Sequence, residues 1–153
     1  MEEISHGDPE QVVIENALRK ARAVWREHAH ETVLGVDTIV ALDSAIYGKP
    51  ADEHAARATL TALAGATHTV FSGMALLDGG PERTVVAHTQ VSFREYGAEL
   101  IDWYLARGEW RGRAGGYAIQ GAGAALVRSI RGDYENVVGL PLASLLDMCP
   151  ELL

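Results

Sequence analysis

The sequence of 153 residues contains only one cysteine, Cys149, so no intrachain disulfide can form. It also shows no secretory signal and no apolar run long enough to span a bilayer. These absences argue against a disulfide-rich secreted domain and against a membrane protein built on transmembrane helices. We therefore expect a protein of the reducing cytoplasm that has no membrane partner.

Positive charge is also in short supply. The chain has 13 lysine and arginine residues against 21 aspartate and glutamate residues, which gives a formal net charge of −8. A protein that holds long nucleic acid needs a basic surface to offset the charge of the phosphates. We therefore expect no long nucleic acid among the partners of this chain.

Three common motifs of nucleotide and metal sites are absent. Gly48-Lys49-Pro50 has no Ser or Thr after the lysine and no preceding glycine at the spacing of a P-loop. Gly121-Ala-Gly123 lacks the third glycine of a dinucleotide fingerprint. The histidines, including His28 and His30, lack the spacing of a zinc site. We therefore assign no histidine to catalysis.

The chain does have the material for a folded core, because 48% of its residues are hydrophobic. At this length we expect one domain over residues 1–153. Helical spacing and capping residues predict helices over residues 9–30, 53–64, 98–107 and 141–148. Runs of β-branched residues predict strands over 32–42, 117–120, 124–130 and 136–138, and a hairpin of 68–77 with 84–93. This order predicts an α/β fold, in which helices flank a mixed twisted sheet.

One acidic residue, Asp37, stands inside the apolar run of residues 33–42. An ionised carboxylate in apolar surroundings costs free energy unless a cation or hydrogen bonds compensate. Asp37 therefore suggests a metal ion, a lysine or a charged ligand at its side. The alternative is a residue at a strand end that caps nearby amides.

Five motifs occur in order along nearly the whole chain: Gly35-Val-Asp37-Thr38, Gly48-Lys49-Pro50-Ala-Asp52, Leu63-Ala-Gly65-Ala-Thr67-His68, Ala114-Gly-Gly-Tyr117-Ala-Ile-Gln120-Gly121 and Gly132-Asp-Tyr134-Glu-Asn136-Val-Val-Gly139-Leu-Pro141. Together they resemble the Maf family of nucleoside triphosphate pyrophosphatases, whose fold is similar to that of the inosine triphosphate pyrophosphatases. The resemblance implies hydrolysis of a nucleoside triphosphate to the monophosphate and pyrophosphate, with a divalent cation, Mg²⁺ or Mn²⁺, as cofactor.

The resemblance also implies roles for two charged residues. Asp37 matches the family's proton acceptor and would also bind the metal, and Lys49 matches a catalytic position. This fits the chemistry, because water that attacks the α-phosphorus needs a base nearby and cations that offset the charge of the leaving pyrophosphate. The alternative for Lys49 is a lysine in a solvated loop.

Thr38 and Gln120 match the positions with which the family reads the base, in the branch that prefers dTTP and UTP. A glutamine amide both donates and accepts hydrogen bonds, as the edge of a pyrimidine requires. Without the resemblance, Gln120 is equally a solvent-facing residue of a glycine-rich turn. Because side chains alternate along a strand, contact of Asp37 and Thr38 with one ligand requires the strand to end or bulge there.

Arg113 stands where the family often has lysine, so it either binds phosphate or lies in solvent. Glu3 matches a carboxylate that assists the metal.

The family's Ser-x-Ser-Pro-Arg-Arg loop has no counterpart in this sequence, and we expect the first strand and first loop of the family to be missing. Two hypotheses follow: a pyrophosphatase, or a weak or inactive relative that binds nucleotide or only dimerises. An uncovered sheet edge would favour a homodimer.

Overall fold

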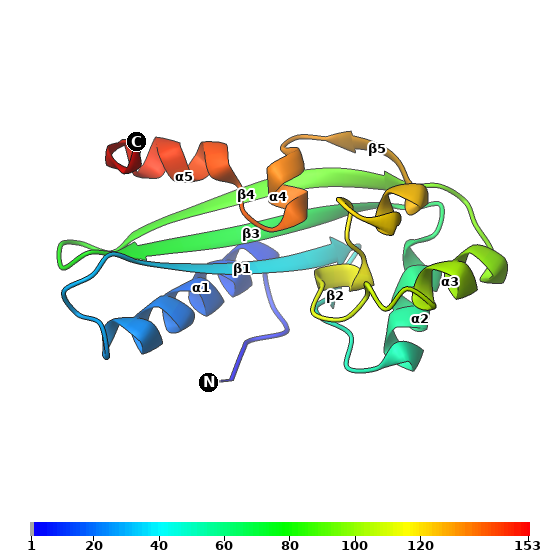
Figure 1. The fold of residues 1–153 in the computed structure, drawn as a ribbon, viewed down its shortest axis with the longest axis horizontal. Helices are drawn as coiled ribbons and strands as arrows, with labels where there is room; N and C mark the ends of the chain where they lie inside the picture. The colour runs from blue at the N-terminus through cyan, green and yellow to red at the C-terminus, as the bar shows by residue number, and fades with distance from the viewer. Residues whose placement is uncertain (1) are drawn as a thin grey trace.

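The structure is a computed structural model that describes residues 2–153, so of the predicted domain only residue 1 lies outside the described part. A five-stranded sheet with the order β2-β1-β3-β4-β5 forms its centre (Figure 1). The strands are β1 (Val33–Leu42), β2 (Ala45–Tyr47), β3 (Thr67–Leu77), β4 (Arg83–Phe93) and β5 (Val127–Arg131). The predicted α/β fold with helices around a sheet is confirmed, with the refinement that each described pairing is antiparallel.

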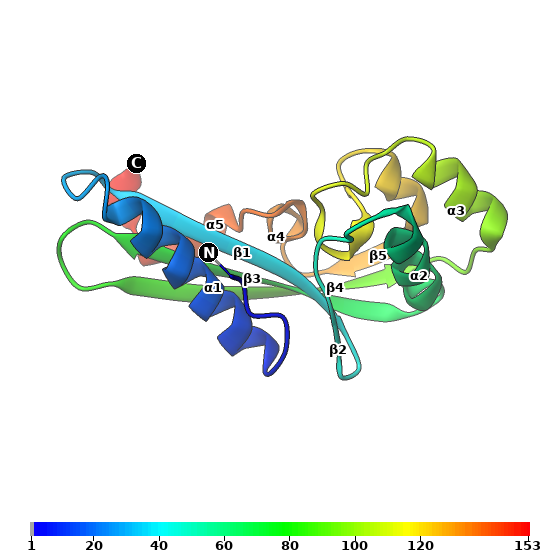
Figure 2. The same cartoon turned by 90° about the horizontal axis from the view of Figure 1, so that it is seen from below.

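The helices lie on both faces of the sheet and at one end of it (Figure 2). They are α1 (Pro9–Trp25), α2 (Glu53–Leu63), α3 (Ala98–Leu105), α4 (Tyr134–Val138) and α5 (Leu142–Met148), with 3₁₀ turns η1 (Ala114–Gly116), η2 (Ala122–Leu126) and η3 (Pro150–Leu152). Helix α1 covers one face, whereas α4 and α5 lie on the other. Among the described residues, no helix combines the length and the apolar character needed to cross a membrane.

Helix α1 packs very closely on β1 and β3 because both strands carry a glycine under it. A β-carbon at Gly35 would lie 2.2 Å from the backbone oxygen of Ala17. One at Gly73 would lie 2.5 Å from the backbone of Val13. These two glycines therefore set the depth at which the helix sits, and with it the position of every side chain that α1 presents to β1.

The predicted helix over residues 9–30 is correct at its start and too long at its end. Asp8 caps α1 by accepting a hydrogen bond from the backbone N–H of Gln11. The helix ends at Trp25, and the next residues are exposed. A short helical extension that buries no apolar face gains little from packing, so the chain turns towards β1 instead.

The last third of the chain differs most from the prediction. The segment predicted as a strand over residues 117–120 is a turn, and residues 124–126 belong to η2, so β5 begins only at Val127. The segment predicted as a strand over 136–138 lies in α4. Asp133 begins that helix by accepting the N–H of Glu135 at 2.9 Å, a local capping contact that outweighs the strand preference of two valines.

Candidate active site

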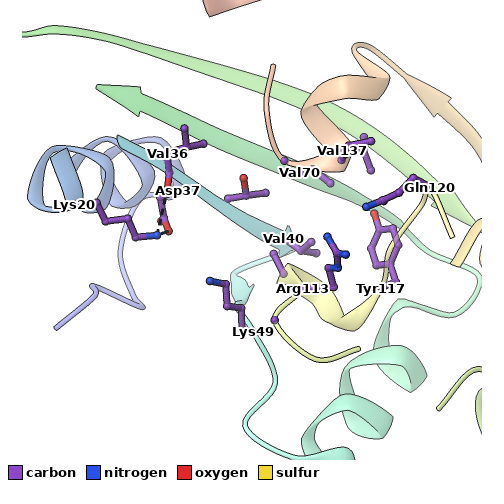
Figure 3. Close-up of a pocket in the computed structure, with 15 residues that line it drawn as sticks. Lys20, Val36, Asp37, Val40, Lys49, Val70, Arg113, Tyr117, Gln120 and Val137 are labelled. Carbon is purple, nitrogen blue, oxygen red and sulfur yellow. Dashed lines mark hydrogen bonds and ion pairs between the residues drawn. The ribbon is translucent and has the colours of Figure 1, made fainter. Parts of the chain in front are cut away.

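The site lies at an open edge of the sheet. Strand β2 pairs with β1 only through residues 40–42 of β1. In the part of the chain that the structure describes, residues 33–39 of β1 therefore have a strand neighbour on one side only. A cleft of about 190 Å³ borders this edge, and we call it the edge cleft. It is lined by Lys20, Val36, Asp37, Thr38, Val40, Lys49, Val70, Gly112, Arg113, Ala114, Tyr117, Gln120, Val137, Val138 and Gly139 (Figure 3).

Asp37 is buried at the edge cleft and holds two hydrogen bonds from α1. Its side chain is 5% exposed. One carboxylate oxygen accepts from Nζ of Lys20 at 2.8 Å, and the other accepts from Nδ2 of Asn16 at 3.0 Å. The charge that the sequence placed in an apolar strand is thus compensated by a lysine and an amide, as a buried carboxylate requires.

Lys20 is the main feature of the site that the sequence did not reveal. The sequence indicated no role for Lys20, but its ammonium group contacts Asp37, Glu3 at 3.0 Å and the carbonyl of Val36 at 3.3 Å. Burial opposes the charged form, yet hydrogen bonds to Asp37 and then Glu3 outweigh it and raise the pKa of Lys20. The signal in the sequence that could have indicated the position of Lys20 was Asn16, a polar residue four positions earlier on the same side of the helix.

Lys49 and Arg113 bring further positive charge to the edge cleft. Both are exposed, and neither forms an ion pair with any residue in the described range 2–153. The loops that carry them are joined, because the carbonyl of Gly48 accepts the N–H of Gly115 at 3.1 Å. The net charge of the chain is −8, but these two cations, which have no ion-pair partner within that range, attract an anion locally.

Asp37 and Thr38 both line the edge cleft although their side chains leave opposite faces of β1. Asp37 contacts α1, whereas the hydroxyl of Thr38 lies 2.8 Å from that of Ser72 on β3. The sequence left open whether the strand ends or bulges here, and the register of β1 with β3 runs unbroken from Val33 to Ala41. The strand has a free edge at these two residues, and both of them line the edge cleft.

The edge cleft has a charged end and an amide end. Figure 3 shows Lys20, Asp37 and Lys49 at one end and Gln120 with Tyr117 at the other. Between them lies an apolar surface formed by Val40, Val70 and Val137. Gln120 is exposed and Tyr117 is buried. This layout suits a molecule that is anionic at one end and has a flat, hydrogen-bonding group at the other.

Behind the edge cleft, Tyr117 is held by a buried histidine. Nε2 of His68 and the hydroxyl of Tyr117 lie 2.7 Å apart, and Nδ1 of His68 has no partner in the described part of the chain. Burial lowers the pKa of His68 to about 4. The ring is therefore neutral at physiological pH and acts as a fixed hydrogen-bonding support.

The predicted metal ligands Asp37 and Glu3 both contact the ammonium group of Lys20. Oxygens of both carboxylates lie within 3.0 Å of one atom, Nζ of Lys20. No group of three or more potential ligands among His, Cys, Asp and Glu occurs in residues 2–153. Mg²⁺ commonly binds through one or two carboxylates together with substrate phosphates, so this donor set fits such an ion.

Comparison with known proteins agrees with this geometry. The family model described as "Maf-like protein" matches residues 1–152. Proteins named dTTP/UTP pyrophosphatase are similar over most of the chain. The protein from Pyrococcus furiosus is 43% identical over 141 residues, which are 92% of this chain and 74% of the relative. The protein from Symbiobacterium thermophilum is 48% identical over 138 residues (90% and 71%), and that from Bacillus cytotoxicus is 45% identical over 141 residues (92% and 74%). The chain belongs to the Maf family.

Proposed function

We propose that this chain is a nucleoside triphosphate pyrophosphatase that hydrolyses dTTP and UTP to the monophosphate and pyrophosphate. The name shared by its relatives supports the reaction and the substrates. The observation that carries the proposal for this chain is the edge cleft, where a buried carboxylate and Lys49, which has no ion-pair partner in residues 2–153, stand at one end and an amide at the other.

In this proposal Asp37 acts as the base. It accepts a proton from the water whose oxygen bonds to the α-phosphorus, while the bond from that phosphorus to the bridging oxygen breaks and pyrophosphate leaves. An ionised carboxylate has about four acceptor sites, and Asp37 uses two of them for Lys20 and Asn16. Those two contacts fix the carboxylate and leave capacity for the water.

Lys49 and Arg113 are proposed to bind the phosphate chain, because fixed cations offset the charge that develops on the leaving group. Asp37 and Glu3 are proposed to hold Mg²⁺ or Mn²⁺. Such an ion, when bound, supplies further positive charge for the pyrophosphate. Lys20 would then hold both carboxylates in place from the α1 side.

Thr38 and Gln120 are proposed to contact the nucleoside. The side chain of Gln120 offers both a donor and an acceptor, which match the N–H and C=O groups of a uracil or thymine edge. The apolar surface of Val40, Val70 and Val137 lies between the two ends and suits the face of a base or sugar.

The test is release of pyrophosphate from dTTP and UTP with Mg²⁺. We expect Asp37→Asn to lower kcat by at least about 100-fold, because the base is lost while the size of the side chain is kept. The matched control is Asp43→Asn, an exposed aspartate with φ of 55°, a conformation that asparagine also tolerates. Equal rates for the two variants, or no pyrophosphate from the unaltered chain, would contradict the enzymatic proposal.

A second candidate function is nucleotide binding without turnover. One observation favours it, namely that both oxygens of Asp37 already accept hydrogen bonds. Calorimetry with a non-hydrolysable UTP analogue separates the candidates when combined with the pyrophosphate assay. Binding heat without product would support this second function, whereas product would exclude it.

The homodimer and the cytoplasmic location stay predictions from the sequence. The dimer has some support from exposed apolar side chains that follow one another closely in the chain, Tyr134, Leu140 and Leu142, which are 42%, 40% and 47% exposed. Apolar exposure of this kind favours association with a second surface.

A further inference from the structure

The loop of residues 118–122, which carries Gln120, is anchored at both of its ends by one small network. The backbone N–H of Ala118 donates to the hydroxyl of Tyr104 at 2.9 Å. That hydroxyl donates to Oε1 of Glu109 at 3.3 Å, and Oε2 of Glu109 accepts the N–H of Ala122 at 3.1 Å. The same carboxylate thus holds one loop end directly and the other through a tyrosine.

We propose that Glu109 and Tyr104 are positioning residues that fix Gln120 for recognition of the pyrimidine base. This inference rests on the proposed function, since it takes Gln120 as the group that contacts the base. Neither Glu109 nor Tyr104 lines the edge cleft, so any effect they have on the substrate is transmitted through the loop.

The directions of the hydrogen bonds in this network are fixed. Ala118 and Ala122 offer N–H donors, and an ionised carboxylate only accepts. Tyr104 is completely buried, and burial raises its pKa, so its hydroxyl keeps its proton. The hydroxyl therefore accepts from Ala118 and donates to Glu109. No other assignment satisfies all the groups, which makes the network a single arrangement rather than one of several.

The position of Gly121 shows how closely the Glu109 carboxylate approaches this loop. A β-carbon at Gly121 would lie 2.7 Å from Oε1 and 2.8 Å from Oε2 of Glu109. These atoms are the flexible end of the Glu109 side chain, so a β-carbon at Gly121 is accommodated only if the carboxylate moves. Gly121→Ala therefore disturbs the same contact from the loop side without replacing Glu109.

The experiment is a double-mutant cycle on KM and kcat for UTP. We expect Glu109→Ala, Gly121→Ala and Gln120→Ala each to raise KM by roughly tenfold, the size of one lost hydrogen bond, while kcat changes by less than about twofold. The double variant Glu109→Ala with Gln120→Ala should be no worse than Gln120→Ala alone, because both act through one group.

Two further variants separate positioning from general stability. Glu109→Gln should recover only part of the affinity that Glu109→Ala loses, because the amide oxygen can accept from Ala122 while the N–H₂ leaves the Tyr104 hydroxyl proton without an acceptor. Glu99→Ala, which removes an exposed acid on α3, should leave KM unchanged. Additive effects of Glu109→Ala and Gln120→Ala, or an unchanged KM in Glu109→Ala, would overturn the inference.

If the unaltered chain releases no pyrophosphate, the proposed reaction fails but the inference is still tested. The same cycle is then measured by calorimetry with a non-hydrolysable UTP analogue, and the dissociation constant replaces KM. Loss of affinity that is shared between Glu109→Ala and Gln120→Ala supports the positioning role. Independent losses, unchanged affinity in Glu109→Ala, or the absence of any binding by the unaltered chain would overturn it.

Discussion

At the scale of single residues, the site depends on how one buried carboxylate is compensated. Asp37 is held by Asn16 and Lys20, and Lys20 also binds Glu3. The sequence identified Asp37 and named a lysine among its possible neighbours. It did not identify which lysine, because the direction of a helical side chain depends on how deeply and at what rotation the helix packs, and these follow from contacts far apart in the chain.

Lys20→Met should lower stability as well as activity. Removing the cation leaves Asp37 with one hydrogen bond fewer in a buried place, which costs about 2 kcal/mol in free energy of unfolding. The control is Arg19→Met, which removes a half-exposed pair with Glu15 and should cost less than about 1 kcal/mol. Urea denaturation measures both. Equal losses in the two variants would show that Lys20 is not a special partner of Asp37.

His68 predicts a pH dependence of stability. Its pKa is about 4 in the folded chain and 6.5 when unfolded, so the unfolded chain binds a proton first as the pH falls. The free energy that the neutral ring contributes to stability is present above pH 6.5, and it is lost progressively as the pH falls to about 4. Between pH 7 and pH 5 this amounts to about 2 kcal/mol.

The measurement for His68 is the free energy of unfolding at several pH values. His68→Gln should lose this part of the pH dependence, because glutamine does not titrate. The exposed His88 provides the control, and His88→Gln should behave like the unaltered chain. A pH profile that is the same in His68→Gln and in the unaltered chain would refute a buried neutral histidine.

At the scale of elements, the close packing of α1 on the sheet links stability to the site. Gly73→Ala places a β-carbon 2.5 Å from the backbone of Val13, which forces α1 outward. We expect a loss of about 1–3 kcal/mol in free energy of unfolding, typical of overpacking, together with lower activity because Asn16 and Lys20 move with the helix.

Gly48→Ala is the matched control for stability, since a β-carbon there meets nothing within 4 Å. Chemical denaturation should separate the two variants clearly. If Gly73→Ala is as stable as Gly48→Ala, the helix is not fixed by contact with the glycines, and the explanation of the position of Lys20 fails with it.

Elements defined by local signals were predictable from the sequence, and those defined by distant contacts were not. The hairpin of β3 and β4 and the cap at Asp8 follow from turn and capping residues close in sequence. The loop of residues 117–120 was predicted as a strand because its apolar residues fit one. Its true shape is set by Tyr104 and Glu109, which lie outside the segment.

At the scale of the whole molecule, the edge cleft collects residues from α1, β1, the loop after β2 and the loops around η1 and α4. The predicted residues Asp37, Thr38, Lys49, Arg113 and Gln120 all line this cleft, and Glu3 reaches it through Lys20. The five motifs predicted this set of residues through their resemblance to the Maf family. Its physical basis, an open strand edge, appears only when the sheet order is known.

The most direct test of the account is a crystal structure of the chain with a non-hydrolysable UTP analogue and Mg²⁺. We expect the phosphates within hydrogen-bonding distance of Lys49 and Arg113, the α-phosphorus near Asp37 and the uracil edge against Gln120. A nucleotide bound away from the edge cleft, or bound there with its base beside Asp37 and its phosphates beside Gln120, would contradict the account.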